Sequence, residues 1–220
     1  MHSSRRDFLR VIAIDGPAAS GKSSVARELA RRLRFVYVNS GAIYRAITWH
    51  ILEKGIHAED LDGVAQALES AAVTSCLSDG ESRVLIDNVD PTDHLRDDRV
   101  NESVARVSRL PVVREIVGKK LHDTARGENL VVEGRDIGSV VFPDTPYKFY
   151  VDASPEVRLQ RRAAQGERDE IVLRDQADSS RPVSPLVIAK DAHVIDTSHL
   201  TVEKVVGEIF ARLKEMGLRI

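Results

Sequence analysis

The chain has 220 residues, 42% hydrophobic and 30% charged, which is enough for one large domain or a core with a small appended one. No run approaches the about 18–20 apolar residues of a membrane span, and the net charge of −2 argues against a protein built to neutralise nucleic-acid phosphates. The single cysteine, Cys76, excludes an internal disulfide framework and cysteine-based zinc motifs. We therefore expect a cytoplasmic monomer without nucleic-acid or membrane partners.

The N-terminal residues are basic and polar. Residues 4–10 resemble the beginning of a twin-arginine export signal, which needs a following apolar region of roughly 7–15 residues. Here the apolar run covers only residues 11–14 and is interrupted at Asp15. Residues 1–8 are therefore expected to form a solvated tail.

Short apolar runs then alternate with helical stretches. Strands are predicted at residues 9–15, 35–38, 130–133, 148–152 and 193–196. Helices are predicted to begin near Lys22, Gly41, Pro111, Pro155 and Thr201. Two of these positions are prolines, which lose no hydrogen bond in a first helical turn. The alternation is typical of an α/β fold in which helices cover both faces of a five-stranded parallel sheet.

Two segments interrupt this alternation. Residues 56–100 contain helical stretches and a predicted hairpin, with strands at 73–77 and 84–87. We interpret this segment as an inserted subdomain rather than another core strand. Residues 165–185 are polar and charged and contain glycine, serine and proline, which indicates a mobile loop.

Residues 16–23, GPAASGKS, match the phosphate-binding pattern G-x-x-x-x-G-K-[ST] in full. The pattern lies between a predicted strand and a predicted helix, as it requires, and the alternative is an ordinary glycine-rich turn. Its backbone N–H groups and the helix dipole attract phosphate, Lys22 can reach the β- and γ-phosphates, and Ser23 can bind Mg²⁺. The residues predicted to bind the nucleoside triphosphate are Gly16, Pro17, Ala18, Ala19, Ser20, Gly21, Lys22, Ser23 and Ser24.

Small-molecule kinases, GTPase switches and mechanical ATPases share this loop. The N-K-x-D sequence that specifies guanine is absent, and residues 130–133 precede Gly-Arg-Asp rather than the Asp-Glu pair usual in mechanical ATPases. Phosphoryl transfer depends mainly on positioning and charge stabilisation, to which arginines in a closing loop are suited. The sequence therefore favours a kinase.

Arginines recur at helical spacing near the predicted mobile loop. The first set is Arg158, Arg161 and Arg162, whose spacing places them on one face of a predicted helix. They are either a catalytic group or ordinary residues of a solvated helix face. The second set is Arg174, Asp178 and Arg181. It indicates either a binding site or a surface salt bridge.

The most specific segments are residues 40–45 (SGAIYR) and 134–143 (GRDIGSVVFP). Together with residues 14–23 and 113–115 and with the arginine-rich segment near residue 174, they resemble the bacterial cytidylate kinases from about residue 10 to 210. The resemblance implies a P-loop nucleoside monophosphate kinase with a three-layer fold. It also implies transfer of the γ-phosphoryl group of ATP to CMP or dCMP with Mg²⁺.

The resemblance also implies a division of the chain. It gives a tail at 1–8, a core at 9–55 and 101–220, a monophosphate-binding insert at 56–100, and a lid at 163–182. The stretch from Arg162 to Arg174 is about ten residues shorter than in typical members, so the lid should be abbreviated. A short lid either permits more ATP hydrolysis or relies more heavily on Arg158 and Arg161.

Site roles follow from the same resemblance, position by position. The residues implied to recognise cytosine are Ser40, Arg114 and Asp136. The monophosphate and neighbouring groups are implied to contact Arg45, Arg135 and Arg181, and the sugar Arg174 and Asp178. The resemblance implies that Arg158 and Arg161 are lid arginines near the transferring phosphoryl group, and together with Lys22 they are the predicted catalytic residues. Ala105 stands where the family often has a serine touching the sugar, which puts that contact in doubt.

The chemistry of cytosine agrees with this assignment. Asp136 and Ser40 can accept a hydrogen bond from its exocyclic amine, whereas uracil presents a carbonyl there, so we expect CMP to be preferred over UMP. Asp136 has the alternatives of a helix cap or an outer magnesium group. Glu133 either contacts Mg²⁺ through water or is a structural carboxylate. The alternative functions are a kinase acting on UMP or AMP and a non-catalytic nucleotide-binding switch.

Overall fold

The computed structural model describes residues 10–164, 175–176, 178–181 and 184–219. Its centre is a sheet in the order β3-β4-β2-β5-β1-β6-β7. Five parallel strands form the core of this sheet: β2 (Val36–Asn39), β5 (Leu130–Gly134), β1 (Val11–Asp15), β6 (Tyr147–Asp152) and β7 (His193–Asp196). The predicted five-stranded parallel sheet is confirmed. Every residue of β1 and β5 is buried, as their continuous apolar runs indicate.

Helices cover both faces of the sheet, which gives three layers. One core cluster packs α1 (Lys22–Leu33) and α8 (Val202–Glu215) against the sheet. The other packs α2 (Ser40–Glu53) and α5 (Pro111–Ala125) against the opposite face. The predicted helix starts at Lys22 and Pro111 are confirmed, and Thr201 caps α8 by accepting the N–H of Lys204 at 3.3 Å.

The predicted hairpin is present as β3 (Val73–Ser78) and β4 (Glu81–Ile86). It does not stand apart from the core sheet, because β4 lies parallel to β2 and the N–H of Tyr37 donates to the carbonyl of Gly80 at 2.9 Å. The hairpin thus raises the strand number from five to seven and covers an edge of β2 that would otherwise be open.

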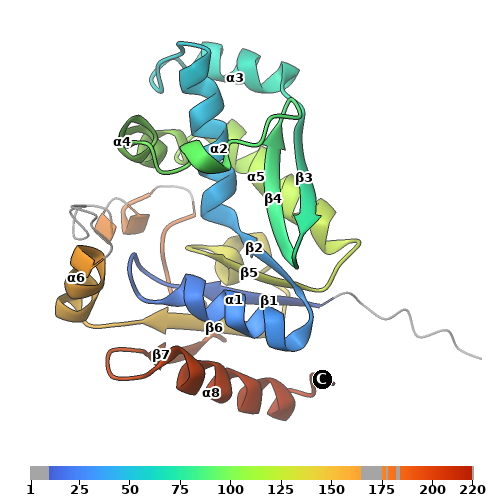
Figure 1. The fold of residues 1–220 in the computed structure, drawn as a ribbon, viewed down its shortest axis with the longest axis vertical. Helices are drawn as coiled ribbons and strands as arrows, with labels where there is room; N and C mark the ends of the chain where they lie inside the picture. Colours follow the sequence, from blue (N-terminus) through green and yellow to red (C-terminus); the bar gives the residue numbers. More distant parts are fainter. Residues whose placement is uncertain (1–9, 165–174, 177, 182–183, 220) are drawn as a thin grey trace, which may run out of the picture.

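Three further helices are α3 (Leu61–Ser70), α4 (Asp98–Val107) and α6 (Pro155–Ala164). A 3₁₀ turn (Thr92–His94) precedes α4, and a π-helical turn (Ile137–Val141) follows β5. Figure 1 shows α3, α4 and the hairpin at one end of the molecule and β7 with α8 at the other. Within the described ranges, no helix is long and apolar enough to cross a membrane.

Candidate active site

The phosphate loop connects β1 to α1, and its backbone adopts the curl that the glycines allow. Gly16 has φ +153°, and a Cβ atom there would lie 2.1 Å from the carbonyl oxygen of Val151. Ala19 (φ 58°) and Gly21 (φ 91°) are in the left-handed region. Only glycine therefore fits at position 16, and the loop turns sharply into the start of α1.

Side chains from α6 and from the segment after β7 donate hydrogen bonds to the carbonyl groups of the phosphate loop. Arg161 and Thr197 both donate to the carbonyl of Ser20, at 3.1 and 2.8 Å. Arg158 donates to the carbonyl of Ala18 at 3.2 Å and pairs with Asp175, whose carboxylate also accepts the N–H of Ala18 at 3.2 Å. The two predicted lid arginines, Arg158 and Arg161, therefore brace the loop in this structure.

A cavity of about 520 Å³, here called the donor cavity, opens beside the loop. It is lined by residues 18–19 and 21–25 of the loop and α1, and by apolar residues around the start of α8. Arg161 and Arg162 reach it from α6. A loop of backbone N–H groups with cations on one side and an apolar surface on the other can hold a triphosphate and a base.

Ser23 and Glu133 provide oxygen atoms where a metal ion would be needed. The Ser23 hydroxyl donates to Glu133 Oε2 at 2.8 Å, and the Tyr37 hydroxyl donates to Glu133 Oε1 at 2.5 Å. Glu133 is only 2% exposed, and burial beside this carboxylate raises the pKa of Tyr37. In the described part of the chain, no group of three histidine, cysteine or acidic residues could hold a metal by itself. A hydroxyl and one carboxylate fit Mg²⁺, which keeps several waters and uses phosphate oxygens as ligands.

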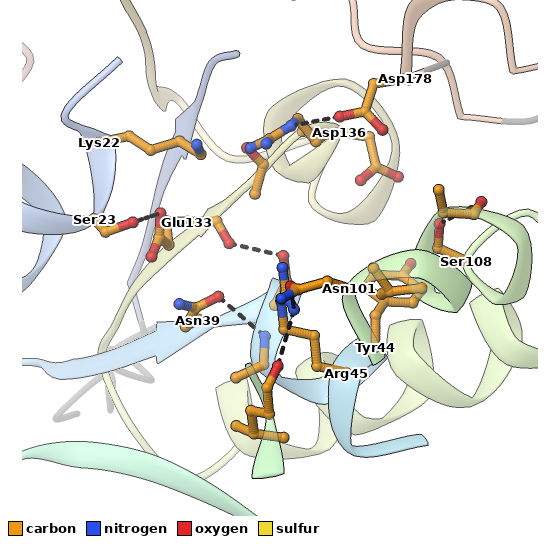
Figure 2. Close-up of a pocket in the computed structure, with 18 of the residues that line it drawn as sticks. Lys22, Ser23, Asn39, Tyr44, Arg45, Asn101, Ser108, Glu133, Asp136 and Asp178 are labelled. Carbon is orange, nitrogen blue, oxygen red and sulfur yellow. Dashed lines mark hydrogen bonds and ion pairs between the residues drawn. The ribbon is translucent and has the colours of Figure 1, made fainter. Parts of the chain in front are cut away.

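A second cavity of about 470 Å³, here called the acceptor cavity, lies between the carboxyl end of β5, α2 and α4 (Figure 2). Asp136 lines this cavity and forms a buried ion pair with Arg114, which is not among the residues that line it; the two side chains are 5% and 8% exposed. Arg114 also donates to the carbonyl of Ser108 at 3.0 Å and lies over the ring of Tyr44, at 5.6 Å from its centre. Burial raises the pKa of Tyr44 to about 12, so its hydroxyl stays protonated.

Asp178 gathers two arginines at the same cavity. Arg135 Nε donates to Asp178 Oδ2 at 2.8 Å, and Arg181 pairs with the other oxygen. Asp178 is 4% exposed, and desolvation lowers the pKa of the Arg181 guanidinium from its ordinary value. Arg174, which the sequence also assigned to this site, lies outside the described residues.

Ser40 and Arg45 reach the cavity from α2, whose start is capped by Asn39 accepting the N–H of Ala42 at 3.1 Å. The Ser40 hydroxyl donates to the carbonyl of Glu133 at 2.8 Å. Arg45 donates to Asn101 Oδ1 at 2.6 Å and to the carbonyl of Leu95 at 2.9 Å. Both side chains are therefore held by hydrogen bonds to neighbouring elements, Ser40 to the end of β5 and Arg45 to the segment around the start of α4.

Asp15 connects the two loops that bound the cavities. Its carboxylate accepts the N–H groups of Ile137 and Gly138 at 2.8 and 2.7 Å, directly after Asp136 in the sequence. Asp15 is 5% exposed, and burial raises the pKa of its carboxyl group to about 6. The residue that precedes Gly16 of the phosphate loop thereby holds the turn that carries Asp136.

The two cavities meet. The residues that line both are Lys22, Ser23, Arg45, Arg96, Asn101 and Arg135. Arg96 and Asn101 were not predicted from the sequence, because they lie in a segment with no recognisable pattern. Ala105 lines the acceptor cavity, as does Ser108, whose hydroxyl lies 3.4 Å from Arg181. A molecule in one cavity would therefore face a molecule in the other across a cluster of cations.

This chain is similar to known proteins of one family over nearly its whole length. A sequence model of the family described as Cytidylate kinase matches residues 12–215. The cytidylate kinase of Corynebacterium efficiens is 44% identical over 213 residues, which cover 90% of this chain and 92% of the relative. That of Pelotomaculum thermopropionicum is 43% identical, covering 92% and 95%, and that of Caldanaerobacter subterraneus subsp. tengcongensis is 40% identical, covering 93% and 94%.

Proposed function

The chain belongs to the cytidylate kinase family, and from this we infer that it transfers the γ-phosphoryl group of ATP to CMP or dCMP, giving ADP and CDP or dCDP. It is an enzyme, a phosphotransferase whose substrates are small nucleotides. The observation that carries this inference is the junction of the two cavities at Lys22, Arg45 and Arg135. Catalysis of phosphoryl transfer rests on such positioning and charge stabilisation.

We propose that ATP occupies the donor cavity. The backbone N–H groups of residues 16–24 would surround its phosphates, and Lys22 would approach the β- and γ-phosphates. Ser23 would bind Mg²⁺ directly and Glu133 through water, and the metal supplies charge neutralisation at the phosphates. Arg161 already borders this cavity and, with Arg158, would stabilise the transferring group. Most of the lid predicted at residues 163–182 lies outside the described residues.

We propose that the acceptor cavity binds the cytidine monophosphate. Asp136 and Ser40 would accept hydrogen bonds from the exocyclic amine of cytosine, and Arg114 would donate to N3 or O2. The buried Arg114–Asp136 pair supports this role, because its charged groups are already desolvated and oriented. Uracil would place a carbonyl against Asp136, and sites built on such polar pairing reject the wrong analogue strongly.

The remaining groups of the substrate are assigned to the arginine cluster. We propose that Arg45, Arg135 and Arg181 hold the monophosphate, and that Asp178 and Arg174 hold the sugar. The support is that Asp178 is buried between two of these arginines and lines the acceptor cavity. Residues 56–100 would act as the monophosphate-binding insert, and the enzyme would work as a cytoplasmic monomer without nucleic-acid or membrane partners.

A direct test is acceptor-dependent ADP release with ATP and Mg²⁺ at equal concentrations of CMP, dCMP, UMP and AMP. We expect turnover with CMP and dCMP only. Turnover mainly with UMP or AMP would keep the kinase but overturn the base assignment to Ser40, Arg114 and Asp136. Release of ADP with no acceptor dependence would leave only a nucleotide-binding protein.

A further inference from the structure

Glu133 lies near the end of β5, and each of its two carboxylate oxygens accepts a hydrogen bond from a hydroxyl group. The Ser23 hydroxyl donates to Oε2 at 2.8 Å (Figure 2), and the Tyr37 hydroxyl donates to Oε1 at 2.5 Å. Ser23 lines both cavities, whereas Tyr37 lines neither among the described residues. Tyr37 thus reaches the carboxylate without facing the space that the substrates would occupy.

The sheet places Tyr37 and Glu133 on adjacent strands. β2 lies parallel to β5, and Tyr37 is level with Val131, two residues before Glu133. Because side chains alternate in direction along a strand, Val131 and Glu133 point to the same face of the sheet. Tyr37 and Val131 pack together on that face under α1, whose first turn carries Ser23. The tyrosine hydroxyl therefore reaches the carboxylate diagonally from one strand to the next.

The ring of Tyr37 is fixed by its surroundings. Its exposed fraction is only 3%, and the guanidinium of Arg27 lies 4.8 Å from the centre of the ring. Arg27 is itself paired with Glu81 at the start of β4, at 2.6 Å. Burial, together with the neighbouring Glu133 carboxylate, raises the pKa of Tyr37, so its hydroxyl keeps the proton that it donates. The hydroxyl is thus held in one place as a hydrogen-bond donor.

We propose that Tyr37 is a positioning residue, which holds the Glu133 carboxylate in the orientation that serves the metal ion bound with ATP. The proposal rests on the proposed kinase function, which assigns Mg²⁺ to Ser23 and Glu133. A serine hydroxyl that binds a metal through its oxygen must direct its proton elsewhere, and Glu133 Oε2 is its acceptor in this structure. Rotation of the carboxylate away from Ser23 would break the bond from Tyr37, and such contacts behind metal ligands commonly set ligand orientation.

The test uses Tyr37→Phe, which keeps the buried ring beside Arg27 and removes only the hydroxyl. Calorimetric titration of the full chain with ATP is carried out in EDTA and again in excess Mg²⁺. The Kd in EDTA should stay within about twofold of the wild type, because the phosphate loop is unchanged. The ratio of the Kd in EDTA to the Kd in Mg²⁺ should fall about tenfold, since losing a contact behind a metal ligand costs about 10–100-fold in metal affinity or activity.

A double variant shows whether Tyr37 acts through Glu133. Glu133→Gln should lower the same ratio of Kd values by at least as much as Tyr37→Phe. Adding Tyr37→Phe to Glu133→Gln should cause no further fall, because two residues that act as one unit are not additive. The matched control is Tyr147→Phe, which removes a hydroxyl from a tyrosine that packs against the same core cluster and lines neither cavity among the described residues. This control should match the wild type.

Steady-state assays with CMP give a second readout. The Mg²⁺ concentration for half-maximal rate should rise about tenfold in Tyr37→Phe, while kcat at saturating Mg²⁺ should fall less than about threefold. Equal weakening of ATP binding with and without Mg²⁺ would reduce Tyr37 to a structural residue, and an unchanged ratio of Kd values would likewise overturn the proposal. A further fall in the double variant would show that Tyr37 does not act through Glu133. A wild type that binds ATP with Mg²⁺ but does not phosphorylate CMP would overturn the kinase function instead.

Discussion

The donor and acceptor cavities are built on opposite principles. The donor cavity is built around the backbone of the phosphate loop. Side chains of Arg158, Arg161 and Thr197 donate hydrogen bonds to the loop carbonyls, and Gly16 has no room for a side chain. The acceptor cavity depends on charged side chains that pair with each other, such as Arg114 with Asp136 and Arg135 with Asp178. A backbone site is complete before its ligand arrives, whereas a paired site must exchange partners when its ligand binds.

This difference has an energetic consequence. The backbone N–H groups of the phosphate loop carry no net charge, and its buried cation, Lys22, donates to the carbonyl of Pro17 at 3.0 Å. Buried arginines and carboxylates need partners, because an unpaired buried charge is strongly destabilising. The buried charged side chains of the acceptor cavity are therefore paired with one another. Removing one member of a pair affects the stability of the fold as well as substrate binding.

The largest expected effect is at the donor side. Lys22 is 7% exposed and donates to the carbonyl of Pro17 at 3.0 Å. Replacing it with methionine keeps an unbranched side chain that is one atom shorter, but removes its charge. We expect kcat to fall by about 10³-fold, with little loss of folding stability. Steady-state kinetics and thermal unfolding of Lys22→Met measure the two effects separately. A variant that kept more than a tenth of the wild-type kcat would show that the charge of Lys22 is not central.

At the acceptor side, Asp136→Asn keeps the shape of the side chain and adds an amide donor. That donor suits the carbonyl of uracil, so we expect the ratio of kcat/KM for CMP over UMP to fall by about 10²-fold. Kinetics with both acceptors measure this ratio. Both Asp136→Asn and Asp136→Ala remove the charge that pairs with Arg114, and Asp136→Ala also removes the hydrogen-bond acceptor, so it should lose the most stability. An unchanged CMP/UMP ratio in Asp136→Asn would remove Asp136 from base recognition.

Asp15 joins the two regions, and its titration gives a pH prediction. The pKa of its carboxyl group is about 6 in the folded chain, against 3.8 as the ordinary value. Its contribution to the free energy of unfolding is therefore full below about pH 4 and is lost as the pH rises through about 6, a change of about 3 kcal/mol. Urea unfolding of the wild type and Asp15→Asn between pH 4 and pH 7 should show a difference that varies with pH in this sense. A constant difference would contradict the raised pKa.

The smallest predicted effect concerns the sugar. Ala105 lines the acceptor cavity one helical turn before Ser108, whose hydroxyl donates to the carbonyl of Ala105 at 3.2 Å. Ala105→Ser adds one hydroxyl, and one net hydrogen bond to the 2′-hydroxyl would raise kcat/KM for CMP over dCMP by about threefold. Paired assays with CMP and dCMP measure this ratio, and equal changes for both acceptors would separate position 105 from the sugar.

The sequence identified the phosphate loop of the donor cavity, but not the apolar residues around the start of α8 that also line it. The phosphate loop is contiguous, and its pattern follows from steric and hydrogen-bonding needs that glycine, lysine and serine meet locally. The five parallel strands and the starts of α1 and α5 followed from apolar runs and from proline. The attachment of the hairpin to β2 was missed, because it depends on contacts between Tyr37 and residues 80–81 that are distant in sequence.

The acceptor side was predicted mainly through family resemblance, and only the set Arg174, Asp178 and Arg181 was singled out by its spacing. Its ion pairs join residues far apart in the chain, such as Arg135 with Asp178, and no local pattern specifies such pairs. Arg96 and Asn101 were not predicted as site residues, because an arginine and an asparagine near the start of α4 have no pattern that distinguishes them from ordinary surface residues. Their place became visible only when the fold brought that segment to the junction of the cavities.

The central claim is that the two cavities form a single reaction centre. An adenosine and a cytidine joined through their 5′ oxygens by a polyphosphate chain would occupy both cavities at once. Calorimetric titration should show one such molecule bound per chain, displaced by ATP alone and by CMP alone. Displacement by only one of the two nucleotides would show that the cavities do not hold donor and acceptor face to face, and would contradict the account.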